Sequence, residues 1–479
     1  MTRPSPSTTD NPPGSEIGTR LASIAVASAL FMEFIDSTAL STALPALSKA
    51  FGSDLVHLKL ALTSYILALA VVTPASGWIA DKYGPRRVFM TAMGVFLVGS
   101  VLCGFSQSLA QLVVFRTIQG IGGALMTPVG RLIVVSSAPR ERLVAAMSWF
   151  TMPALVGPLI GPPLAGFILR IADWPWIFFI NVPVGILGML AVLRFVPPLH
   201  QPDPGRFDVK GFILAAIAIT SLMVAAETAG MGLVPASLQI GAAVLALVMG
   251  AAYIRHALRT ERPVLNIRLV RFATYRASLM GGTLVRVGLG ATPFLLPLLF
   301  QVGLGWGAFE AGLVIIGTSM GALSYKPVAP AVVKRFGFRS TLIFSNVVTA
   351  VLTALPAFFR ETTPVALMVI ILAIGGFMRS MQFTSLNTVA YADIPPSTVS
   401  NASTLAVVTQ QMGLSLGISF GGLMLHLARG GDDAPLTPHQ FILPFIAVGV
   451  VTMLAGPLYR RMSPDAGASI RGRRADVEA

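Results

Sequence analysis

The chain has 479 residues, of which 54% are hydrophobic and 11% are charged. Soluble domains carry about 25% charged residues, so this composition excludes an ordinary soluble protein and indicates one embedded in a lipid bilayer. The net charge of +14 does not indicate a nucleic-acid partner, because the basic residues lie at the ends of apolar segments, as the positive-inside rule expects.

Apolar segments long enough to cross a bilayer follow one another along nearly the whole chain. Residues 1–19 precede them and are rich in Ser, Thr, Pro and Gly, which predicts a disordered start. A helix needs about 20 apolar residues to span the hydrocarbon core. By that measure, the predicted membrane helices cover 21–46, 58–80, 88–106, 109–133, 144–169, 177–196, 211–229, 237–254, 277–301, 309–332, 340–359, 364–389, 401–427 and 440–459. The basic stretch 462–479 predicts a solvated tail.

These fourteen predicted helices divide into two groups of six with an extra pair between them. The groups predict a first bundle over 20–197, a linker with two extra helices over 198–274 and a second bundle over 275–461. Most Lys and Arg residues fall on the cytosolic side if both termini are cytosolic, and an odd number of helices would remove that asymmetry. We therefore expect an all-α integral membrane protein with both ends in the cytosol.

Matching strings in the two groups of six indicate an internal duplication. Aligning Gly84 with Gly337 sets Asp-Lys-Tyr-Gly-Pro-Arg against Lys-Arg-Phe-Gly-Phe-Arg, so the second copy keeps the basic residues and loses the acid. Two repeated bundles are a known construction of secondary transporters, with the substrate site between the halves. A further pair of matching strings is Arg116-Thr-Ile-Gln119 and Arg379-Ser-Met-Gln382.

A short charged loop separates the second and third predicted helices. Its basic residues alone could serve only to fix the orientation of the chain in the membrane. That interpretation does not explain the acid, which can bond to a helix N-terminus or to a basic residue and latch the bundles in one state. The glycines allow close helix approach and a tight turn. We therefore predict a gating role for the loop residues Gly77, Asp81, Lys82, Gly84, Arg86 and Arg87.

The same loop resembles the signature of the major facilitator superfamily, G-x-x-x-D-[RK]-x-G-[RK]-[RK], with Pro85 as one extra residue. The stretches 35–45 and 174–185 resemble the fourteen-helix drug:proton antiporters of the EmrB/QacA type. Strings along nearly the full chain are similar to the MdtD-type members of that family. The resemblance implies the major facilitator fold, with 14 transmembrane helices in two pseudo-symmetric six-helix bundles plus two inserted helices.

A glycine- and proline-rich stretch in the fifth predicted helix resembles the motif of proton-driven exporters, with Ala165 in place of one glycine of its final pair. Small residues let helices approach closely, and proline bends a helix. The residues alone indicate close packing, and the resemblance implies a hinge and a seal against proton leak. The residues assigned to this gate are Gly157, Pro158, Gly161, Pro162 and Gly166.

Two carboxylates lie within the first predicted helix. Glu33 and Asp36 are three residues apart and share one face of that helix. An ionisable group near the bilayer centre costs a few kcal/mol on insertion scales, so each is a functional candidate. Neighbouring carboxylates in a low-dielectric medium favour protonation of one of them, as a reversible proton carrier requires. Alternatively, Asp36 only hydrogen-bonds nearby hydroxyl groups. Glu227, at the end of the seventh predicted helix, is expected to be solvated.

Three arginines lie at membrane depth and oppose these acids. An arginine stays charged, so it cannot carry the proton, but it can pair with a carboxylate or bind an anion bidentately. Arg116 is a feature of the family and is expected to tune a helix-1 carboxylate in proton coupling. Arg286 and Arg379, in the second bundle, are less expected in a site built only for hydrophobic cations. The residues predicted to bind substrate are Arg286, Arg379, Gln119, Gln382 and Asn387.

The predicted function is proton-coupled secondary export of small molecules across the bacterial cytoplasmic membrane, by a monomer in the lipid bilayer. The resemblance implies multidrug efflux, although some relatives are linked to export of citrate or iron-citrate. Acidic residues favour a cationic cargo, and the buried arginines favour the anion. A membrane enzyme would need a nucleophile–base pair, a metal set or a phosphate loop, and the sequence contains none. It also predicts no cofactor and no metal site. A non-transporting receptor or scaffold would not require opposing intramembrane charges.

Overall fold

The computed structural model describes six stretches of the chain, 16–137, 143–197, 205–229, 234–395, 398–430 and 436–466. These stretches consist of helices joined by turns and short irregular segments, and they contain no β-strand. Thirteen helical segments among the described residues have the length and composition to cross a membrane, and α6 (Leu143–Ile171), at 29 residues, supplies the fourteenth. The predicted disordered start and basic tail lie mostly outside the described residues.

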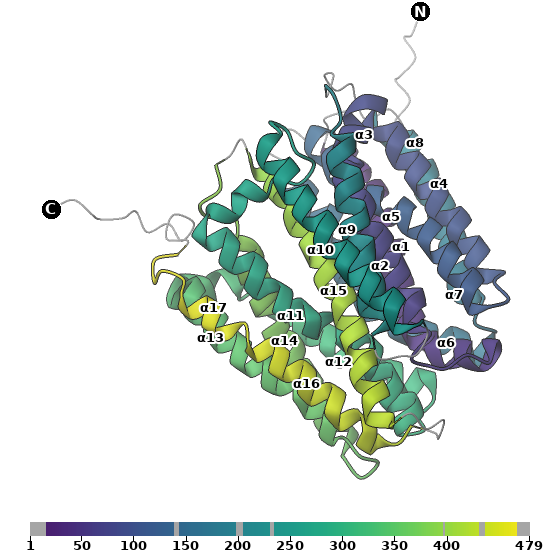
Figure 1. Ribbon diagram of the computed structural model, residues 1–479. Helices are drawn as coiled ribbons and strands as arrows, with labels where there is room; N and C mark the ends of the chain where they lie inside the picture. The colour runs from purple at the N-terminus through teal and green to yellow at the C-terminus, as the bar shows by residue number, and fades with distance from the viewer. Residues whose placement is uncertain are drawn as a thin grey trace, which may run out of the picture.

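The first bundle holds six membrane crossings, which lie to the right in Figure 1. Two of them are assembled from shorter helices. The second crossing joins α2, a 3₁₀ turn and α3, and the sixth joins α7 and α8. The helices of this bundle are α1 (Glu16–Phe51), α2 (Lys59–Val72), η1 (Thr73–Ala75), α3 (Ser76–Tyr83), α4 (Pro85–Gly104), α5 (Leu109–Ser137), α6 (Leu143–Ile171), α7 (Trp176–Phe179) and α8 (Asn181–Phe195).

The second bundle holds the last six crossings. A 3₁₀ turn, η3 (Ile267–Arg271), leads into it, and its first crossing ends in a π-helical turn, η4. The other elements of this bundle are α11 (Ala273–Leu298), η4 (Leu299–Gly303), α12 (Ala308–Tyr325), α13 (Ala329–Ala354), η5 (Leu355–Phe358), α14 (Val365–Val389), α15 (Val399–Arg429), η7 (Pro438–Phe441), α16 (Ile442–Met453) and α17 (Gly456–Arg460).

The inserted pair, α9 (Val209–Thr228) and α10 (Ala236–Arg259), lies in front of the two bundles in Figure 1. Asp208 caps α9, because its carboxylate accepts a hydrogen bond from the Gly211 backbone N–H at 2.9 Å. The same carboxylate contacts the His256 side chain of α10 at 2.7 Å and so links the two helices. α9 packs on both α2 and α15, whereas only 6% of the residues are buried in the most apolar 18-residue stretch of α10. The pair therefore covers the seam between the bundles and exposes its outer helix to lipid.

The two bundles share the same pattern of helix breaks. Pro74 lies in the 3₁₀ turn before α3, and Gly84, with φ of +87°, ends α3. Pro327 lies between α12 and α13, and Gly337, with φ of +76°, kinks α13. A positive φ favours glycine, so both turns require this residue. The predicted helix 309–332 is thus interrupted after Tyr325, at the same distance before its glycine as in the first bundle. The alignment of Gly84 with Gly337 is a true structural repeat.

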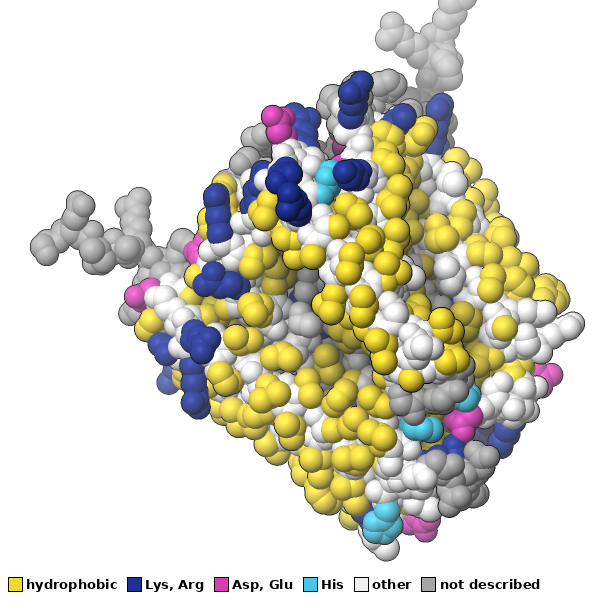
Figure 2. Space-filling view, in the orientation of Figure 1, with side chains coloured by type: hydrophobic (Ala, Val, Ile, Leu, Met, Phe, Trp, Pro, Cys, Tyr) yellow, Lys and Arg dark blue, Asp and Glu magenta, His cyan; other side chains and the backbone are white. Residues whose placement is uncertain are grey.

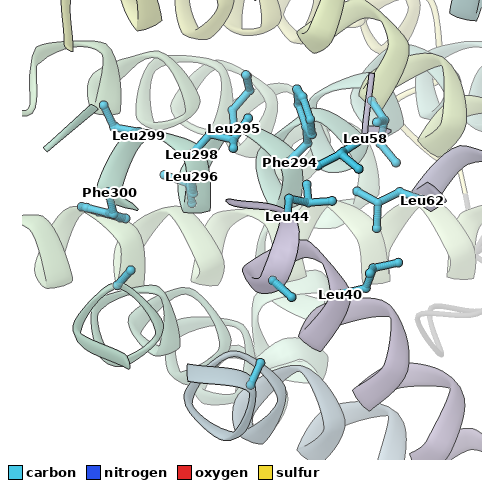
Figure 3. Packing of buried hydrophobic residues seen from close by; sticks show 14 of the residues in the cluster. Leu40, Leu44, Leu58, Leu62, Phe294, Leu295, Leu296, Leu298, Leu299 and Phe300 are labelled. Carbon is cyan, nitrogen blue, oxygen red and sulfur yellow. The ribbon is translucent and has the colours of Figure 1, made fainter. Parts of the chain in front are cut away.

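The two ends of the molecule differ in charge and in packing. Lys and Arg side chains gather along the upper and left edges in Figure 2, and hydrophobic side chains cover much of the rest. At the opposite end, a buried apolar cluster takes residues from both bundles. Figure 3 shows Leu40 and Leu44 of α1 beside Phe294 of α11. We call these two regions the basic end and the far end.

Two pairs of helices join the bundles. α6 packs on α12, and α2 packs on α15. A Cβ added at Gly166 would lie 2.5 Å from the Phe309 Cα, and one added at Gly312 would lie 2.7 Å from the Pro162 carbonyl oxygen. The polar contacts that described residues make between the bundles also lie toward the far end, and one of them is the hydrogen bond that Gln301 Nε2 donates to Thr42 O at 2.9 Å. The bundles are therefore closed against each other at the far end.

Candidate functional site

A buried polar network surrounds Asp36 inside the first bundle. The Arg116 guanidinium forms an ion pair with Asp36 Oδ2, and both side chains are fully buried. Gln119 Nε2 donates to Asp36 Oδ1 at 2.8 Å, and Asn181 Nδ2 donates to the same oxygen at 3.0 Å. Every one of these partners is a donor to the carboxyl group. The network therefore matches an ionised aspartate.

Arg116 is also fixed by groups other than Asp36. Its Nε donates to the Ala61 carbonyl oxygen at 3.1 Å, its Nη1 donates to Gln119 Oε1 at 2.6 Å, and its guanidinium lies 4.4 Å from the centroid of the Tyr65 ring. Charge-assisted hydrogen bonds and an aromatic face both stabilise a buried guanidinium. The arginine therefore binds α5 to α1 and α2 through its charge.

Glycines let α5 bring this arginine close to its neighbours. A Cβ added at Gly120 would lie 2.7 Å from the Tyr65 carbonyl oxygen of α2, and one added at Gly122 would lie 2.6 Å from the Phe96 backbone nitrogen of α4. Neither position has room for a side chain, because backbone atoms of the neighbouring helices lie in the way. The glycines that follow Gln119 in the sequence motif therefore serve close helix packing.

Glu33 has a simpler environment than Asp36. It is partly exposed, and its Oε2 accepts a hydrogen bond from the Thr127 hydroxyl at 2.8 Å. Among the described residues it has no ion pair. A hydroxyl group can either donate or accept, so this contact suits the ionised and the protonated glutamate alike. The two predicted acids thus both face α5 but differ in how firmly they are held.

Arg286 lies buried in α11 with few partners. Its Nη2 donates to Asn387 Oδ1 at 3.4 Å, while its Nε and Nη1 have no hydrogen-bond partner among the described residues. Glycines leave room for it, because a Cβ added at Gly282 would lie 2.9 Å from Arg286 Nη1 and one added at Gly413 would lie 2.9 Å from Arg286 Cβ. Arg286 and Asn387, both predicted to bind substrate, are therefore brought together.

Arg379 and Gln382 lie one turn apart on α14. Arg379 is partly exposed and has no hydrogen bond or ion pair with any described residue. Gln382 is fully buried, and its Nε2 donates to Asn346 Oδ1 at 2.8 Å. Neither Arg286 nor Arg379 forms an ion pair with Glu33 or Asp36 in the described part of the chain, and Asp36 pairs with Arg116 within its own bundle.

The predicted gating loop is engaged through its aromatic and basic residues. Trp78 Nε1 donates to the Gly205 carbonyl oxygen at 2.9 Å, Lys82 Nζ lies 4.6 Å from the Trp78 ring centroid, and Arg86 Nη2 donates to the Leu193 carbonyl oxygen at 2.7 Å. Asp81 has no polar partner among the described residues. Arg87 is exposed, and a Cβ added at Gly77 would meet nothing within 4 Å, so the expected close approach at Gly77 is wrong for this structure.

The glycines of α6 contact two different helices. A Cβ added at Gly157 would lie 2.6 Å from the Phe34 Cβ, and one added at Gly161 would overlap the Thr38 hydroxyl, so both positions lie against α1. Gly166 lies against α12 of the second bundle. The predicted packing role of the motif therefore applies both within and between the bundles. The side chain of Pro158 lies outside the described residues.

The sequence interpretation missed one ionic group and misplaced another. Lys59 was not singled out, yet it is fully buried at the start of α2, and its Nζ lies 3.1 Å from Glu227 Oε2. Glu227 was expected to be solvated, but it is only 6% exposed. The end of a membrane helix contacts water only where no other helix covers it, and at Glu227 residues of α2 and α15 cover it. The sequence signal for Asn181 is its place in the stretch 174–185, which carries part of the family resemblance.

The described residues offer no metal site, since no three His, Cys, Asp or Glu side chains come together there. The sole cysteine of the chain, Cys103, is buried and contacts Gln119 Oε1 at 3.7 Å.

The sequence model of the Major Facilitator Superfamily matches residues 26–254 and 278–477. A protein of Pectobacterium atrosepticum, named as a multidrug resistance protein, MdtD, is 36% identical over 447 residues, covering 92% of this chain and 95% of that protein. A protein of Serratia proteamaculans with the same name is 36% identical over 444 residues, covering 92% of this chain and 93% of that protein.

Solved structures share the fold at low sequence identity. A D-xylose–proton symporter is similar with a TM-score of 0.68 and 17% identity, covering 94% of this chain and 99% of that one. A POT family transporter in complex with a peptide conjugate has a TM-score of 0.70 and 16% identity, covering 93% and 96%. At this identity, the likeness concerns the arrangement of the helices.

Proposed function

Because the chain belongs to the major facilitator superfamily, we propose that it is a proton-coupled exporter of small molecules across the cytoplasmic membrane. It is a multi-pass inner-membrane transport protein and not an enzyme. The proposal adds the direction of transport, the coupling to protons, the cytosolic termini and a monomeric working state. The relatives named for multidrug resistance support a broad range of amphiphilic cargo.

The observation that carries proton coupling is the network of Asp36, Arg116, Gln119 and Asn181. A proton that reaches Asp36 would remove the charge that compensates a fully buried guanidinium. Because an uncompensated buried charge is unfavourable by several kcal/mol, protonation would favour a different arrangement of α1 and α5. Glu33, with its single hydroxyl partner, is suited to exchange a proton with water and pass it toward Asp36.

The basic end is assigned to the cytosol, since the positive-inside rule places Lys and Arg on that side. The far end, where the bundles meet, then faces outward, and the structure represents a state closed to the outside. Asp81, Gly84 and the basic residues of the same loop would form the latch of the opposite state, in which the cytosolic ends close. The unpartnered Asp81 carboxylate fits a latch that is released here. The α6 glycines would let the bundles rock without parting.

The cargo has two candidates, and the second rests on a specific observation. An anionic metabolite such as citrate or iron-citrate is favoured by Arg286 and Arg379, which have no acid paired with them among the described residues. Arginine binds carboxylates bidentately. Gln382 and Asn387 would then orient the cargo. A cationic drug would instead approach Glu33 in the first bundle.

Transport by purified protein in proteoliposomes tests both proposals. With a pH-sensitive dye inside the vesicles, a transported cation added outside should enter in exchange for protons, so the internal pH should rise. Panels of lipophilic cations and of tricarboxylates, each run with inward and outward pH gradients, would identify the cargo. Transport at the same rate under all pH gradients would contradict proton coupling, and a scaffold or receptor would move neither panel.

A further inference from the structure

A fully buried ion pair lies at the far end of the molecule, away from the Asp36 network. Lys59 Nζ, at the start of α2, lies 3.1 Å from Glu227 Oε2, near the end of the inserted helix α9. The Lys59 side chain has no exposed surface, and the Glu227 side chain is 8% exposed. A lysine and a glutamate at such depth are unfavourable unless they compensate each other. Each therefore depends on the position of the other.

A third element, α15, completes the group. Lys59 Nζ donates to the Ser419 carbonyl oxygen at 3.5 Å, and the Ser419 hydroxyl donates to Glu227 Oε1. Gly422, one turn further along α15, makes room for the lysine, because a Cβ there would lie 2.8 Å from Lys59 Cδ. The cation thus comes from the first bundle, the acid from the inserted pair, and the hydroxyl and the space from the second bundle.

We propose that Lys59, Glu227 and Ser419 form a lock that holds the outer ends of the two bundles together, and that the inserted helices supply its acid. The lock rests on the proposed function, since a transporter that alternates its access must separate α2 from α15 at this end. Separation takes Lys59 away from Ser419 and disturbs its contact with Glu227. The inserted pair, which lies on both α2 and α15, therefore biases the protein toward the outward-closed state.

A second ion pair at the same end is suited to a weaker role. Asp54, in the turn before α2, forms an ion pair with Arg429 at the end of α15. The Asp54 side chain is 27% exposed, so water screens this pair. It gives a comparison for the lock, because it joins the same two bundles without the inserted helices.

Accessibility of one introduced cysteine measures the state of the lock. Ala43 of α1 is 1% exposed within the apolar cluster of the far end, so Ala43→Cys is reached from outside only when that end opens. An impermeant thiol reagent is applied to right-side-out vesicles without cargo or pH gradient. Glu227→Gln should raise the labelling rate by about tenfold or more, because it leaves Lys59 uncompensated. The exchanged pair Lys59→Glu with Glu227→Lys should return the rate toward that of the parent.

Matched variants separate the lock from general damage. Glu310→Gln removes an exposed acid from the first turn of α12 and should leave labelling unchanged. Gly422→Ala keeps both charges and displaces only the lysine stem, so it should increase labelling even if Glu227→Gln does not fold. The parent without Ala43→Cys reports any reaction of the buried Cys103. Unchanged labelling in Glu227→Gln or in Gly422→Ala, or no recovery in the exchanged pair, would overturn the lock. Because no gradient is used, a failure of proton-coupled export would leave this result intact.

Discussion

The two bundles place an arginine at matching positions but treat it differently. Arg116 of α5 is fully buried, paired with Asp36 and hydrogen-bonded to Gln119 and a backbone carbonyl group, and only its Nη2 has no hydrogen-bond partner among the described residues. Arg379 of α14 is partly exposed and has no polar partner among the described residues. α11, the counterpart of α1, carries Arg286 and not an acid. The duplicated fold therefore contains an arginine paired with an acid in its first bundle and two arginines without a paired acid in its second.

This difference indicates separate roles for the two bundles, one in responding to protons and the other in binding anions. A closed network of donors around one carboxylate responds to a proton, because protonation removes its only negative charge. Arginines without an acid respond to an anion, since their charge is available to it. We interpret the first bundle as the proton-responsive half and the second as the half that can favour anionic cargo.

The strongest way to break the comparison is Asp36→Asn. The amide cannot titrate, and its NH₂ group would meet the donors of Gln119 and Asn181, leaving Arg116 uncompensated. We expect gradient-driven transport in proteoliposomes to fall to background and the protein to lose about 3–5 kcal/mol of stability. Adding Arg116→Gln should recover thermal stability without recovering transport. Wild-type transport by Asp36→Asn would remove this network from the coupling mechanism.

The second half is tested by Arg379→Ala and Arg286→Ala. A hydrogen bond to a charged group contributes about 1.5–3 kcal/mol, so each change should weaken binding of a tricarboxylate by about tenfold to a hundredfold. Affinity for lipophilic cations should stay the same or increase. Isothermal titration of both ligand classes with purified protein measures this. If Arg379→Ala binds anions and cations as the wild type does, the arginine has only a structural role.

A smaller effect is expected for Glu33→Gln. Its side chain keeps the Thr127 hydrogen bond and leaves no buried cation unpaired, so stability should change little. Transport should slow by a few-fold and its pH dependence should weaken, because one proton-exchanging group is lost while Asp36 remains. Rates measured across a pH series, with Thr127→Val as a control that keeps the acid, check this. A loss as complete as that of Asp36→Asn would make Glu33 the principal proton carrier.

The smallest effect is expected at Asp54. Burial raises the pKa of this carboxyl group, but the Val56 backbone N–H and the Arg429 guanidinium outweigh burial and hold the pKa below its usual range. The ionised carboxylate stabilises the folded protein fully above its unfolded-state pKa of about 3.9. This stabilisation is lost only as the pH falls toward the lower pKa that the group has in the folded protein. The ratio of the Ala43→Cys labelling rates with Asp54→Asn and without it cancels the effect of pH on the thiol itself, and this ratio should thus be equal at about pH 7 and pH 5.

Asp54→Asn should increase labelling of Ala43→Cys by only a few-fold, because exposed ion pairs contribute about 1 kcal/mol or less. An effect equal to that of Glu227→Gln would mean that the exposed pair, and not the inserted helix, holds the far end closed.

The membrane helices were predictable because their signal is local. Their apolar runs and charged boundaries can be read without knowing the neighbours, and the predicted 211–229 and 237–254 correspond to α9 and α10. The aligned Gly84 and Gly337 were also readable, since each turn needs a positive φ. The interruption of the helix after Tyr325 was less visible, because apolar residues resume directly after Lys326 and Pro327.

Contacts between distant helices were less predictable from the sequence. Asp36 and Arg116 could be proposed as partners because both charges lie at membrane depth, yet the donation from Asn181 depends on how α8 enters the bundle. Glu227 was misjudged because its burial comes from α2 and α15, which are remote in the chain. The roles predicted for the gating and substrate residues stay predictions.

The exposure of α10 has a mechanical consequence. Its apolar stretch, 237–254, spans about 27 Å as a helix, close to the roughly 30 Å of an average hydrocarbon layer. A membrane helix and the bilayer around it adjust to each other in tilt and thickness, and with so little buried surface α10 is held in place mainly by the lipid and by α9. α10 packs on α9, which carries Glu227. We therefore expect bilayer thickness to affect the position of α9 and, through Glu227, the contact between the two bundles.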